Sequence, residues 1–494
     1  MTETSYIPNT KQAQENLGCV LVLGLGKSGC AAATYCANLL GSRVTSLTVA
    51  AGKANPTAET FVERLRAMGA RAEFDLESFD EHYDLCIASP GISQFSDFYQ
   101  SAKAASAEIM SEIEFAWRES AADSRWIAIT GTNGKTTTTS LIAHLLQGAG
   151  MNAQAVGNIG DVCLDAVAGH PADVYVAETS SFQLASTIDF APVASILLNV
   201  TPDHLTWHKS MEEYTQAKLK VFANLSKVPG SVAILDATDE ITRQTVKAFK
   251  AMDPAERGFA YIPLGTASGL RESMIDRCGS ENAAYVDADE VMHVVYQGTD
   301  HVLCSVGDLK IKGDHNVANA LAAACAALAV GISDDDLIQG LTSFNALEHR
   351  IEPCGLINGV ECYNDSKATN VDATLKAFAA FEPGTVVVLL GGRDKFTDLT
   401  PLVLAANSYA KAVVCFGEAG DRFAQAFADL NSPVTVLRAS LLEDALDTAL
   451  GVTCPGDSVV LSPACASFDE FKSFEHRGTM FKSYVAARMG NGQA

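Results

Sequence analysis

The stretch TGTNGKTTTT, residues 130–139, has the residue types of a phosphate-binding loop. Glycines let a backbone approach phosphate oxygens, the amine of Lys135 can reach phosphates, and the hydroxyl of Thr136 can bind Mg²⁺. The general pattern G-x-x-x-x-G-K-[ST] has a glycine five positions before its second glycine, and this sequence has Ile129 there, counted from Gly134. The stretch therefore predicts nucleotide binding through a variant loop, with an ordinary turn as the alternative.

The stretch GLGKSG, residues 24–29, fits the pattern G-x-G-x-x-G and follows the apolar run CVLVL. This arrangement is typical of a dinucleotide-binding βαβ unit, in which an acidic residue after the second strand holds the ribose. The second apolar run, RVTSLTV, continues into AAGKAN and has no acidic residue there. We therefore favour another nucleotide or a phosphate ligand over NAD, and a purely structural turn is the third interpretation.

Two further residues could bind a metal beside the variant loop. Glu178 ends the apolar run VYVAE, and His204 follows the run ASILLNV. A carboxylate at the carboxyl end of a strand is well placed to bind a metal next to a nucleotide. Taken singly, each residue is more often structural, and Lys218 in YTQAKLKVF has the pattern of a solvated helix lysine.

Polar side chains also gather farther along the chain. Asn316 and Asn319, in GDHNVANALAAA, lie three positions apart and would share one helical face. Their amides could recognise a base or cap the helix. The stretches YNDSKATN, LLGGRDK and LSPACASFDEFKSFEHRG follow apolar runs and are either site loops or plain turns.

These candidate residues lie between apolar runs that alternate with helical segments. The runs are mostly apolar throughout, which is typical of strands covered on both faces. Helical periodicity lies between them, as in KTTTTSLIAHLLQGAG, which ends in glycine. The order predicts an α/β fold with mainly parallel sheets. The predicted strands are CVLVLG, LCIASPG, WIAITG, VYVAE, ASILLNV, SVAIL, TVVVLLGG, AVVCFG and SVVLSPA.

Two polar stretches are interpreted as linkers between domains. They are RESAADSR, residues 118–125, and TSFNALEHRIEP, residues 342–353. The chain has 494 residues, enough for about three domains. We predict domains at residues 1–122, 123–348 and 349–494.

The composition argues against several classes of partner. The formal net charge is −24, which is unfavourable for nucleic acid or an anionic membrane. The N-terminal residues lack the pattern of a signal peptide, and the longest apolar stretch, VANALAAACAALAVG, is too short to span a bilayer. The 13 cysteines form no C-x-x-C pair, so we expect buried, reduced thiols rather than zinc or disulfides. These features predict a soluble, cytoplasmic protein.

Taken together and in chain order, these motifs resemble those of the Mur ligase family, the ATP-dependent amide ligases of peptidoglycan assembly. TGTNGKTTT resembles the family's ATP loop, which lacks the first glycine of the general pattern. GDHNVAN resembles the adenine-binding G-x-H-N-x-x-N, and LEHR with NDSKATN resembles the linker and C-terminal nucleotide motifs. VGNIG, SSFQL, DSKATN and LSPACASFDEFKSFEHRG look most like the members that add D-glutamate. The D-N-P-R-type motif expected of the members that add meso-diaminopimelate is absent.

The resemblance implies a fold and an activity. The three domains would be an N-terminal Rossmann-like UDP-substrate domain, a central P-loop ATPase domain with a mainly parallel sheet, and a C-terminal Rossmann-like amino-acid domain. The enzyme would use ATP to join D-glutamate to UDP-N-acetylmuramoyl-L-alanine through an acyl phosphate. It would need Mg²⁺, as two ions, and we expect it to be a monomer.

The resemblance also implies roles for individual residues. Those implied to bind ATP are Gly131, Thr132, Asn133, Gly134, Lys135, Thr136, Thr137, Asn316, Asn319, Arg350, Asp365 and Lys367. Catalytic roles fall to Lys135, Glu178, His204 and Lys218, and the metal ligands would be Thr136, Glu178, His204 and Lys218, the last as a carbamate. The UDP-linked substrate would contact Gly26, Lys27, Ser28, Ser89, Pro90, Gly91 and Asn158. D-glutamate would contact Thr369, Lys395, Ser467 and Phe474.

One departure from the family pattern concerns uracil. The D-glutamate-adding members usually have an acidic residue after the second strand, and TVAAGKAN has none, which leaves the mode of uracil binding open. A folylpolyglutamate synthase or a different Mur ligase is the first alternative function. An NAD-dependent dehydrogenase or nucleotide-sensing module built on GLGKSG is the alternative from another class.

Overall fold

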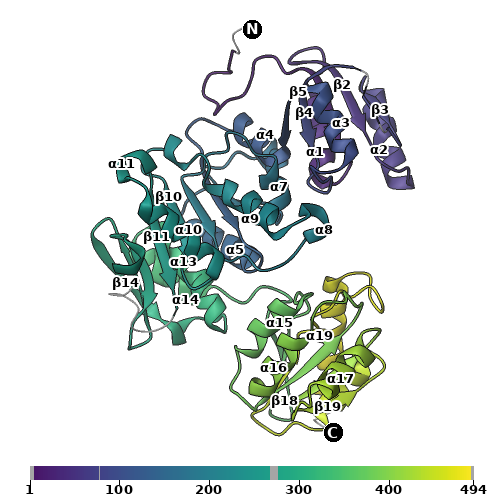
Figure 1. The fold of residues 1–494 in the computed structure, drawn as a ribbon, viewed down its shortest axis with the longest axis vertical. Coiled ribbons are helices and arrows are strands. Elements are labelled where there is room, and N and C mark those ends of the chain that lie inside the picture. Colours follow the sequence, from purple (N-terminus) through teal and green to yellow (C-terminus); the bar gives the residue numbers. More distant parts are fainter. Residues whose placement is uncertain (1–4, 77, 80, 267–275, 491–494) are drawn as a thin grey trace. The chain divides into compact units, whose positions relative to one another are not determined.

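The computed structural model describes residues 5–76, 78–79, 81–266 and 276–490 (Figure 1). Helices and strands alternate over most of these ranges, and the strands form three sheets within them. Two groups of residues make most of their contacts internally. We call them the N-terminal unit, Met1–Val306 with Ala318–Leu341, and the C-terminal unit, Gly307–Val317 with Thr342–Ala494. The predicted α/β class is confirmed.

The first sheet of the N-terminal unit is parallel throughout, with the order β3-β2-β1-β4-β5. This is a doubly wound order, in which ligands bind at the carboxyl ends of the strands where the order reverses. The strands are β1 (Gly18–Leu23), β2 (Val44–Ala50), β3 (Arg71–Glu73), β4 (Tyr83–Ala88) and β5 (Ser106–Ser111). The helices are α1 (Lys27–Asn38), α2 (Pro56–Ala67), α3 (Asp97–Ala105) and α4 (Glu112–Glu119). The predicted strands CVLVLG and LCIASPG are β1 and β4, which are neighbours at the reversal.

The second sheet has the order β14-β13-β12-β11-β10-β9-β6-β8-β7 and is parallel except where β13 pairs with its two neighbours. Its strands are β6 (Arg125–Thr130), β7 (Ala153–Gly157), β8 (Val174–Glu178), β9 (Ala194–Leu197), β10 (Val232–Asp236), β11 (Ala260–Gly265), β12 (Ala283–Val286), β13 (Val291–Tyr296) and β14 (Thr299–Ser305). The accompanying helices are α5 (Lys135–Gly148), α6 (Cys163–Gly169), α7 (Ser181–Ala185), α8 (Leu205–His208), α9 (Met211–Leu219), η1 (Lys220–Phe222), η2 (Leu225–Lys227), α10 (Glu240–Ala251), α11 (Pro254–Arg257), η3 (Val306–Asp308), α13 (Asp314–Ala329) and α14 (Asp334–Ser343). The prediction of a mainly parallel central sheet is confirmed.

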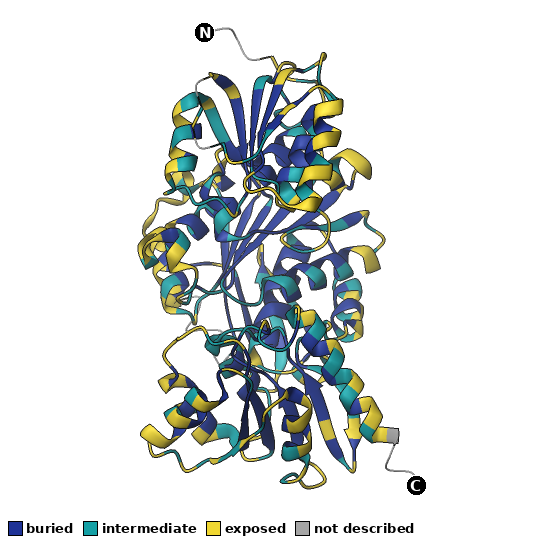
Figure 2. Ribbon diagram, turned by 90° about the vertical axis from the view of Figure 1, so that its right-hand side faces the viewer, coloured by how far each residue is buried: buried dark blue, intermediate teal, exposed yellow. Residues whose placement is uncertain are grey.

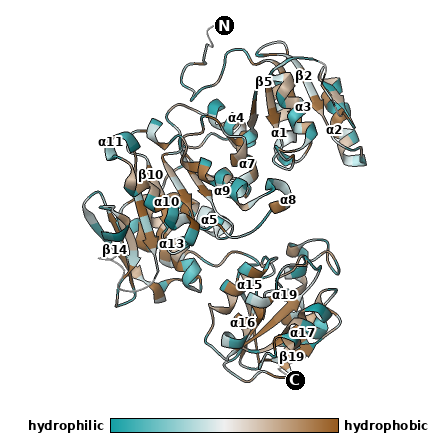
Figure 3. Cartoon of the chain, viewed as in Figure 1, coloured by the Kyte–Doolittle hydropathy of each residue, from teal (hydrophilic) through white to brown (hydrophobic). Residues whose placement is uncertain are grey.

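The inner strands of this sheet are apolar because helices cover both of their faces. Every residue of β8 and β9 is buried, as are the last five residues of β6. Figure 2 shows buried strands between helices with exposed outer faces, and Figure 3 shows the same strands as hydrophobic. Burial on both faces explains why these runs do not alternate between apolar and polar residues.

The C-terminal unit contains a sheet with the order β15-β16-β20-β17-β18-β19, in which only β15 is antiparallel to its neighbour. The strands are β15 (Glu352–Ile357), β16 (Val360–Asn364), β17 (Val386–Gly391), β18 (Ala410–Phe416), β19 (Thr435–Arg438) and β20 (Ser458–Leu461). The helices are α15 (Val371–Phe378), α16 (Thr400–Tyr409), α17 (Gly420–Asp429), α18 (Leu442–Leu450) and α19 (Phe474–Gly490). The predicted strands TVVVLLGG, AVVCFG and SVVLSPA are β17, β18 and β20.

Alternate residues of β17 contribute to two hydrophobic cores, one on each face of this sheet. Val388 packs in a core that includes Phe423 of α17. Its neighbour Val387 packs in a core that includes Leu446 of α18 and Phe481 of α19. This alternation follows from the two-residue period of a strand, and it holds α19 against the sheet.

The stretch 118–125, interpreted above as a linker, begins inside a helix. Arg118 lies in the last turn of α4, is buried, and donates hydrogen bonds to Glu108 at 2.9 Å and to Glu114 at 2.8 Å. The charge at the start of this stretch therefore belongs to a buried ion-pair network, and only the residues between α4 and β6 connect the two sheets. The domain ranges 1–122, 123–348 and 349–494 stay predictions.

The structure bears on two expectations from composition, the burial of the cysteines and the lack of a membrane-spanning helix among the described residues. Nine of the 13 cysteines are buried, and Cys454 is exposed. Burial raises the pKa of thiols such as Cys36, to about 12, which keeps them protonated and unreactive. In the ranges given above, no helix combines the length and the hydropathy that a membrane span requires.

Candidate active site

The loop at residues 130–134 joins β6 to α5 at the carboxyl edge of the second sheet. Gly134 precedes the helix and has a φ of +89°, in the left-handed region that favours glycine. A Cβ atom at this position would lie 2.5 Å from Oδ1 of Asn319 on α13. The glycine therefore permits both the turn and the close approach of α13. Unsatisfied N–H groups and the helix dipole at the start of α5 favour a phosphate here.

Reciprocal hydrogen bonds hold this loop to the segment that follows β9. The amide of Asn133 donates to Oδ1 of Asn199 at 2.9 Å, and Nδ2 of Asn199 donates to the carbonyl of Asn133 at 3.1 Å. The hydroxyl of Thr132 donates to the carbonyl of Thr201 at 3.1 Å and lies 3.0 Å from the hydroxyl of Tyr214. These contacts fix the shape of a loop that lacks the usual first glycine.

Two lysines donate to the same carbonyl oxygen in this loop. Nζ of Lys135 lies 2.9 Å from the oxygen of Gly131, and Nζ of Lys218 lies 2.7 Å from it. Lys218 is only 2% exposed, so its interpretation as a solvated helix lysine is wrong. Burial, and then the charge of Lys135, lower the pKa of Lys218 well below its ordinary value.

Glu178 ends β8 in register with Ile129 of β6, directly beside the loop. Its Oε1 accepts a hydrogen bond from Nδ2 of Asn158 at 2.7 Å. Its Oε2 is buried and has no hydrogen-bond partner among the described residues. Burying a carboxylate oxygen without a partner costs free energy, and a bound cation would offset that cost. Carboxylate and hydroxyl oxygens are the hard ligands that Mg²⁺ prefers. Glu178, together with Thr136 at the start of α5, therefore fits a magnesium site.

His204 stands at the start of α8 in a left-handed conformation with a φ of +55°. Such a conformation costs about 1–3 kcal/mol for a residue with a side chain and is enriched at functional sites. The imidazole packs against the ring of Phe182, with 4.8 Å between centroids, and its Nε2 lies 3.6 Å from Oδ2 of Asp203. The side chain is 48% exposed, so its ring remains accessible to a ligand.

The loops predicted to bind the UDP-linked substrate meet at the carboxyl ends of β1 and β4. Leu23 pairs with Ala88, so the two strands end together. The hydroxyl of Ser89 donates to the carbonyl of Gly24 at 3.1 Å, which joins the loop of Ser89, Pro90 and Gly91 to the loop of Gly26, Lys27 and Ser28. Asn158 follows β7 and is held by Glu178, as described above.

Three residues predicted to hold the nucleotide, Arg350, Asp365 and Lys367, lie close together in the C-terminal unit. Asp365 follows β16, is buried, and accepts a hydrogen bond from the hydroxyl of Ser462 at 2.7 Å. Burial raises the pKa of Asp365 to about 7, against the smaller opposing effects of Ser462 and Arg350. The amide of Lys367 donates to the carbonyl of His349 at 3.1 Å. On α13, Asn316 donates through Nδ2 to the carbonyl of Lys312 at 2.7 Å.

The residues predicted to bind D-glutamate lie on three loops and at the start of α19. Thr369 precedes α15, Lys395 follows β17, Ser467 follows β20 and Phe474 begins α19. Nζ of Lys367 lies 3.8 Å from the centroid of the Phe474 ring. The amide of Arg393 donates to the carbonyl of Ala466 at 2.8 Å, which joins the loop of Lys395 to that of Ser467. Lys395 itself is exposed.

The sequence matches two family models over most of its length. Residues 129–327 match the Mur ligase middle domain, and residues 349–465 match the Mur ligase glutamate ligase domain. A protein of Thermoanaerobacter pseudethanolicus named UDP-N-acetylmuramoylalanine--D-glutamate ligase is 36% identical over 471 residues, covering 94% of this chain and 98% of that protein. The chain belongs to the Mur ligase family.

Other Mur ligases are also similar to this chain, one in sequence and one in fold. A protein of the same name from Acidobacterium capsulatum is 36% identical over 475 residues, which cover 95% of this chain and 96% of that protein. The crystal structure of MurF from Acinetobacter baumannii covers 83% of this chain and 91% of its own, with a TM-score of 0.54 and 17% identity. The likeness in structure confirms the predicted fold of three α/β domains.

The match also bears on the variant loop. The middle-domain match begins at Ile129, the position at which the general pattern has a glycine. The loop therefore lies within the region that matches the Mur ligase middle domain, and nucleotide binding by its residues stays a prediction.

Several further residues shape the site of this Mur ligase and were not predicted from the sequence. Tyr214 lies four positions before Lys218 on α9, and Nζ of Lys218 is 4.7 Å from the centroid of its ring. That spacing puts both residues on one helical face and was the signal that could have found Tyr214. Asn199 and the buried His208, which lies 2.9 Å from the hydroxyl of Ser181, gave no comparable signal.

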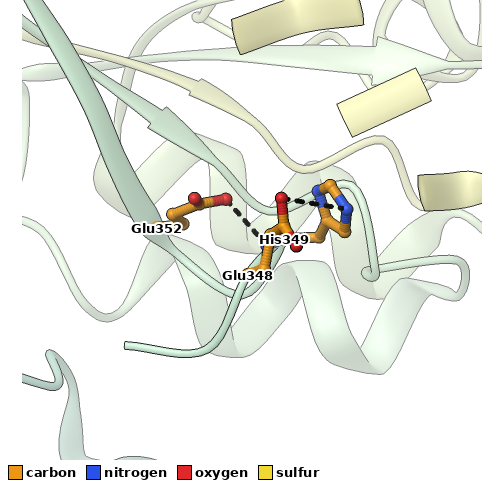
Figure 4. Close-up of side chains that lie close together, drawn as sticks. All are labelled: Glu348, His349 and Glu352. Carbon is orange, nitrogen blue, oxygen red and sulfur yellow. Dashed lines mark hydrogen bonds and ion pairs between the residues drawn. The ribbon is translucent and has the colours of Figure 1, made fainter. Parts of the chain in front are cut away.

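A second group of potential metal ligands lies in the C-terminal unit of this Mur ligase. Figure 4 shows Glu348, His349 and Glu352, whose ligand atoms lie within 4.8 Å of one another. Lys482 donates a hydrogen bond to each of the two glutamates, and Nδ1 of His349 lies 2.8 Å from Nδ2 of Asn364. The ammonium group pairs with both carboxylates, so the cluster is an ion-pair network.

Proposed function

We propose that this Mur ligase joins D-glutamate to UDP-N-acetylmuramoyl-L-alanine and converts ATP to ADP and phosphate. The observation that carries this proposal is the 36% identity, over 94% of the chain, to a relative named for that reaction. The nucleotide loop and the buried Glu178 support the ATP-dependent part. The proposed setting is the cytoplasm, with small-molecule substrates and a monomeric enzyme.

The chemistry follows from the low reactivity of a carboxylate. Its leaving group would be oxide, so it must first be phosphorylated, and the terminal phosphoryl group of ATP is transferred to the carboxylate of the UDP-linked substrate. The amine of D-glutamate then attacks the acyl phosphate, a tetrahedral intermediate forms, and phosphate leaves. The protein contributes mainly position and charge. Lys135 and the amides at the start of α5 stabilise the charge on the transferring phosphoryl group.

Mg²⁺ would supply charge neutralisation at the phosphates, and we propose that two ions are held by Thr136, Glu178, His204 and Lys218. An ammonium group at Lys218 would repel both the metal and Lys135. We propose that Lys218 is carbamylated, because its buried amine is held beside a second cation. Both influences favour the neutral amine, which is the form that attacks CO₂.

Carbamylation joins the neutral amine of Lys218 to CO₂. The nitrogen lone pair of Lys218 forms a bond to the carbon of CO₂, and one C=O electron pair moves onto oxygen. The nitrogen then loses one proton to solvent. The product is an anionic group whose oxygens are suitable Mg²⁺ ligands, and its charge attracts Lys135 rather than repelling it.

The test of the proposed function is ADP release in the presence of the UDP-linked substrate and ATP. D-glutamate should stimulate release, whereas L-glutamate, L-alanine and meso-diaminopimelate should not. Equal stimulation by another amino acid would identify a different Mur ligase. Saturable binding of NAD(H), with no ADP release under any of these conditions, would favour the dehydrogenase alternative.

Lys395→Ala should raise the Michaelis constant for D-glutamate about tenfold, which corresponds to about 1.4 kcal/mol. Its ammonium group provides a point charge for a substrate carboxylate, and its exposure in the structure limits the effect of losing it. The constant for ATP should change little. Saturation curves for both substrates measure this, with Lys411→Ala as the control, because Lys411 pairs with Asp457 at the opposite end of the strands. A normal D-glutamate curve would remove Lys395 from the acceptor site.

A further inference from the structure

Arg477, in the first turns of α19, is a guanidinium group buried among the C-terminal loops. It is 0% exposed. Its Nε donates to the hydroxyl of Ser366 at 2.9 Å, and its Nη2 donates to the carbonyl of the same residue at 2.9 Å. The hydroxyl of Ser366 in turn donates to the carbonyl of Phe474 at 2.8 Å. One arginine thus links the loop after β16 to the start of α19.

The same guanidinium group binds a second loop and lies against a third. Nη2 donates to the carbonyl of Cys465 and Nη1 to that of Ala466, both at 3.1 Å. A Cβ atom at Gly392 would lie 3.0 Å from Nη1 of Arg477 and 2.3 Å from the carbonyl oxygen of Ala466. The loops after β20 and β17 therefore both close around the arginine.

These are the loops that carry the predicted D-glutamate residues. Ser366 lies three positions before Thr369, Ala466 lies next to Ser467, and the loop of Gly392 continues to Lys395. Phe474 is joined to Arg477 through Ser366. A single buried side chain therefore sets the relative positions of backbone segments that are far apart in the sequence.

The carboxylates of Asp469, Asp365 and Glu470 act on Arg477 through space, and each raises its pKa by less than burial lowers it. In the part of the chain that the structure describes, it is hydrogen bonded to carbonyl and hydroxyl oxygens and to no carboxylate. Burial lowers its pKa to about 10, so it stays charged at neutral pH. Because its hydrogen bonds go to backbone carbonyls and one hydroxyl, its direct effect is on the positions of the loops that carry those groups.

We propose that Arg477 is the positioning residue of the amino-acid pocket: it holds three loops and α19 together and thereby sets the positions of the residues that bind the amino acid. The identity of that amino acid as D-glutamate rests on the proposed function. The nucleotide residues have anchors of their own, because Asp365 is held by Ser462 and Lys367 by His349.

The test compares Arg477→Met, Arg477→Lys and Ser366→Ala with the wild type in saturation curves for D-glutamate and ATP. Arg477→Met should raise the Michaelis constant for D-glutamate at least thirtyfold and that for ATP less than threefold. Arg477→Lys should show an intermediate increase, because lysine keeps the charge but cannot reach all the acceptors. Ser366→Ala, which loses one acceptor and the link to Phe474, should also be intermediate. Arg488→Met is the control, since Arg488 lies on the same helix and pairs with Asp447 and Glu443.

Hydrogen exchange provides a readout that needs no substrate. In Arg477→Met, the amides of Gly391 and Arg393, which donate to Pro463 and Ala466, should exchange at least tenfold faster than in the wild type. Amides between β18 and β19 should keep their rates. If Arg477→Met does not fold, Arg477→Lys and Ser366→Ala test whether Arg477 positions these loops.

The possible results separate this inference from the proposed function. Unchanged D-glutamate constants together with unchanged loop exchange would overturn the role of Arg477. Equal losses for ATP and D-glutamate would also overturn it, because they would indicate a general structural role. A wild-type enzyme that ignores D-glutamate would refute the proposed function alone, and the exchange rates would still test the arginine.

Discussion

Lys218→Ala is expected to retain less than about 1% of wild-type ligase activity, as measured by ADP release, a loss of the size found when a catalytic electrostatic contact is removed. Lys218 is buried 2.7 Å from the carbonyl of Gly131, against the ring of Tyr214. The alanine variant lacks the proposed carbamate and leaves the Oε2 of Glu178 without the neighbouring metal ligand. The expected loss comes from the metal site and not from substrate binding, so ATP and D-glutamate should still bind.

Short carboxylates should restore part of this activity. The cavity left by the lysine side chain can admit formate or acetate, whose oxygens replace those of the carbamate as Mg²⁺ ligands. The measurement is ADP release at rising formate concentrations, with sodium chloride at equal ionic strength as reference. Lys218→Arg should be inactive and is too bulky to leave space for formate.

A control variant and an NMR measurement complete the test of the carbamate at Lys218. Lys227→Ala is the matched control, because Lys227 is a half-exposed lysine paired with Asp189, and it should keep full activity without any response to formate. Wild-type enzyme in labelled bicarbonate should show a carbamate resonance by ¹³C NMR that Lys218→Ala lacks. Full activity of Lys218→Ala, or no resonance in the wild type, would refute the carbamate.

Lys135→Ala is expected to lower the rate of ADP formation on the order of 10²–10³-fold, or about 2.7–4 kcal/mol of transition-state stabilisation. Nζ of Lys135 donates to the carbonyls of Gly131 and Thr132, which holds the amine over the loop where phosphate would lie. Its contact is charge-assisted and strengthens as charge develops on the transferring phosphoryl group. The rate should therefore fall more than the affinity for ATP.

The measurement is the rate of ADP release at saturating ATP, together with the ATP dependence of the thermal unfolding temperature. Lys250→Ala is the control, because Lys250 is an exposed lysine of the N-terminal unit that donates to the carbonyls of Asp276 and Arg277. A rate within tenfold of the wild type would show that Lys135 does not face the phosphate. A variant that no longer gains stability with ATP would place its main role in nucleotide binding.

Local sequence was sufficient for the fold class and for the strand–turn–helix setting of residues 125–148. The apolar runs became β1, β4, β6, β8, β9, β10, β17, β18 and β20, because a strand covered on both faces needs apolar residues at every position. KTTTTSLIAHLL became α5 because helical periodicity and the preceding glycine are local properties. The order of these motifs also indicated the Mur ligase family.

Burial and charge pairing were decided only by the tertiary structure. Lys218 looks like a surface lysine within its own helix, and it is buried because Gly131, 87 positions earlier, accepts its hydrogen bond. Arg477 gave no local signal either, since its partner Ser366 lies 111 positions away. Arg118 has the sequence context of a polar linker, but in the structure it is paired with Glu114 and Glu108. Each of these environments is formed by segments distant in the chain, and the energy of a charged side chain depends on that environment more than on its neighbours in sequence.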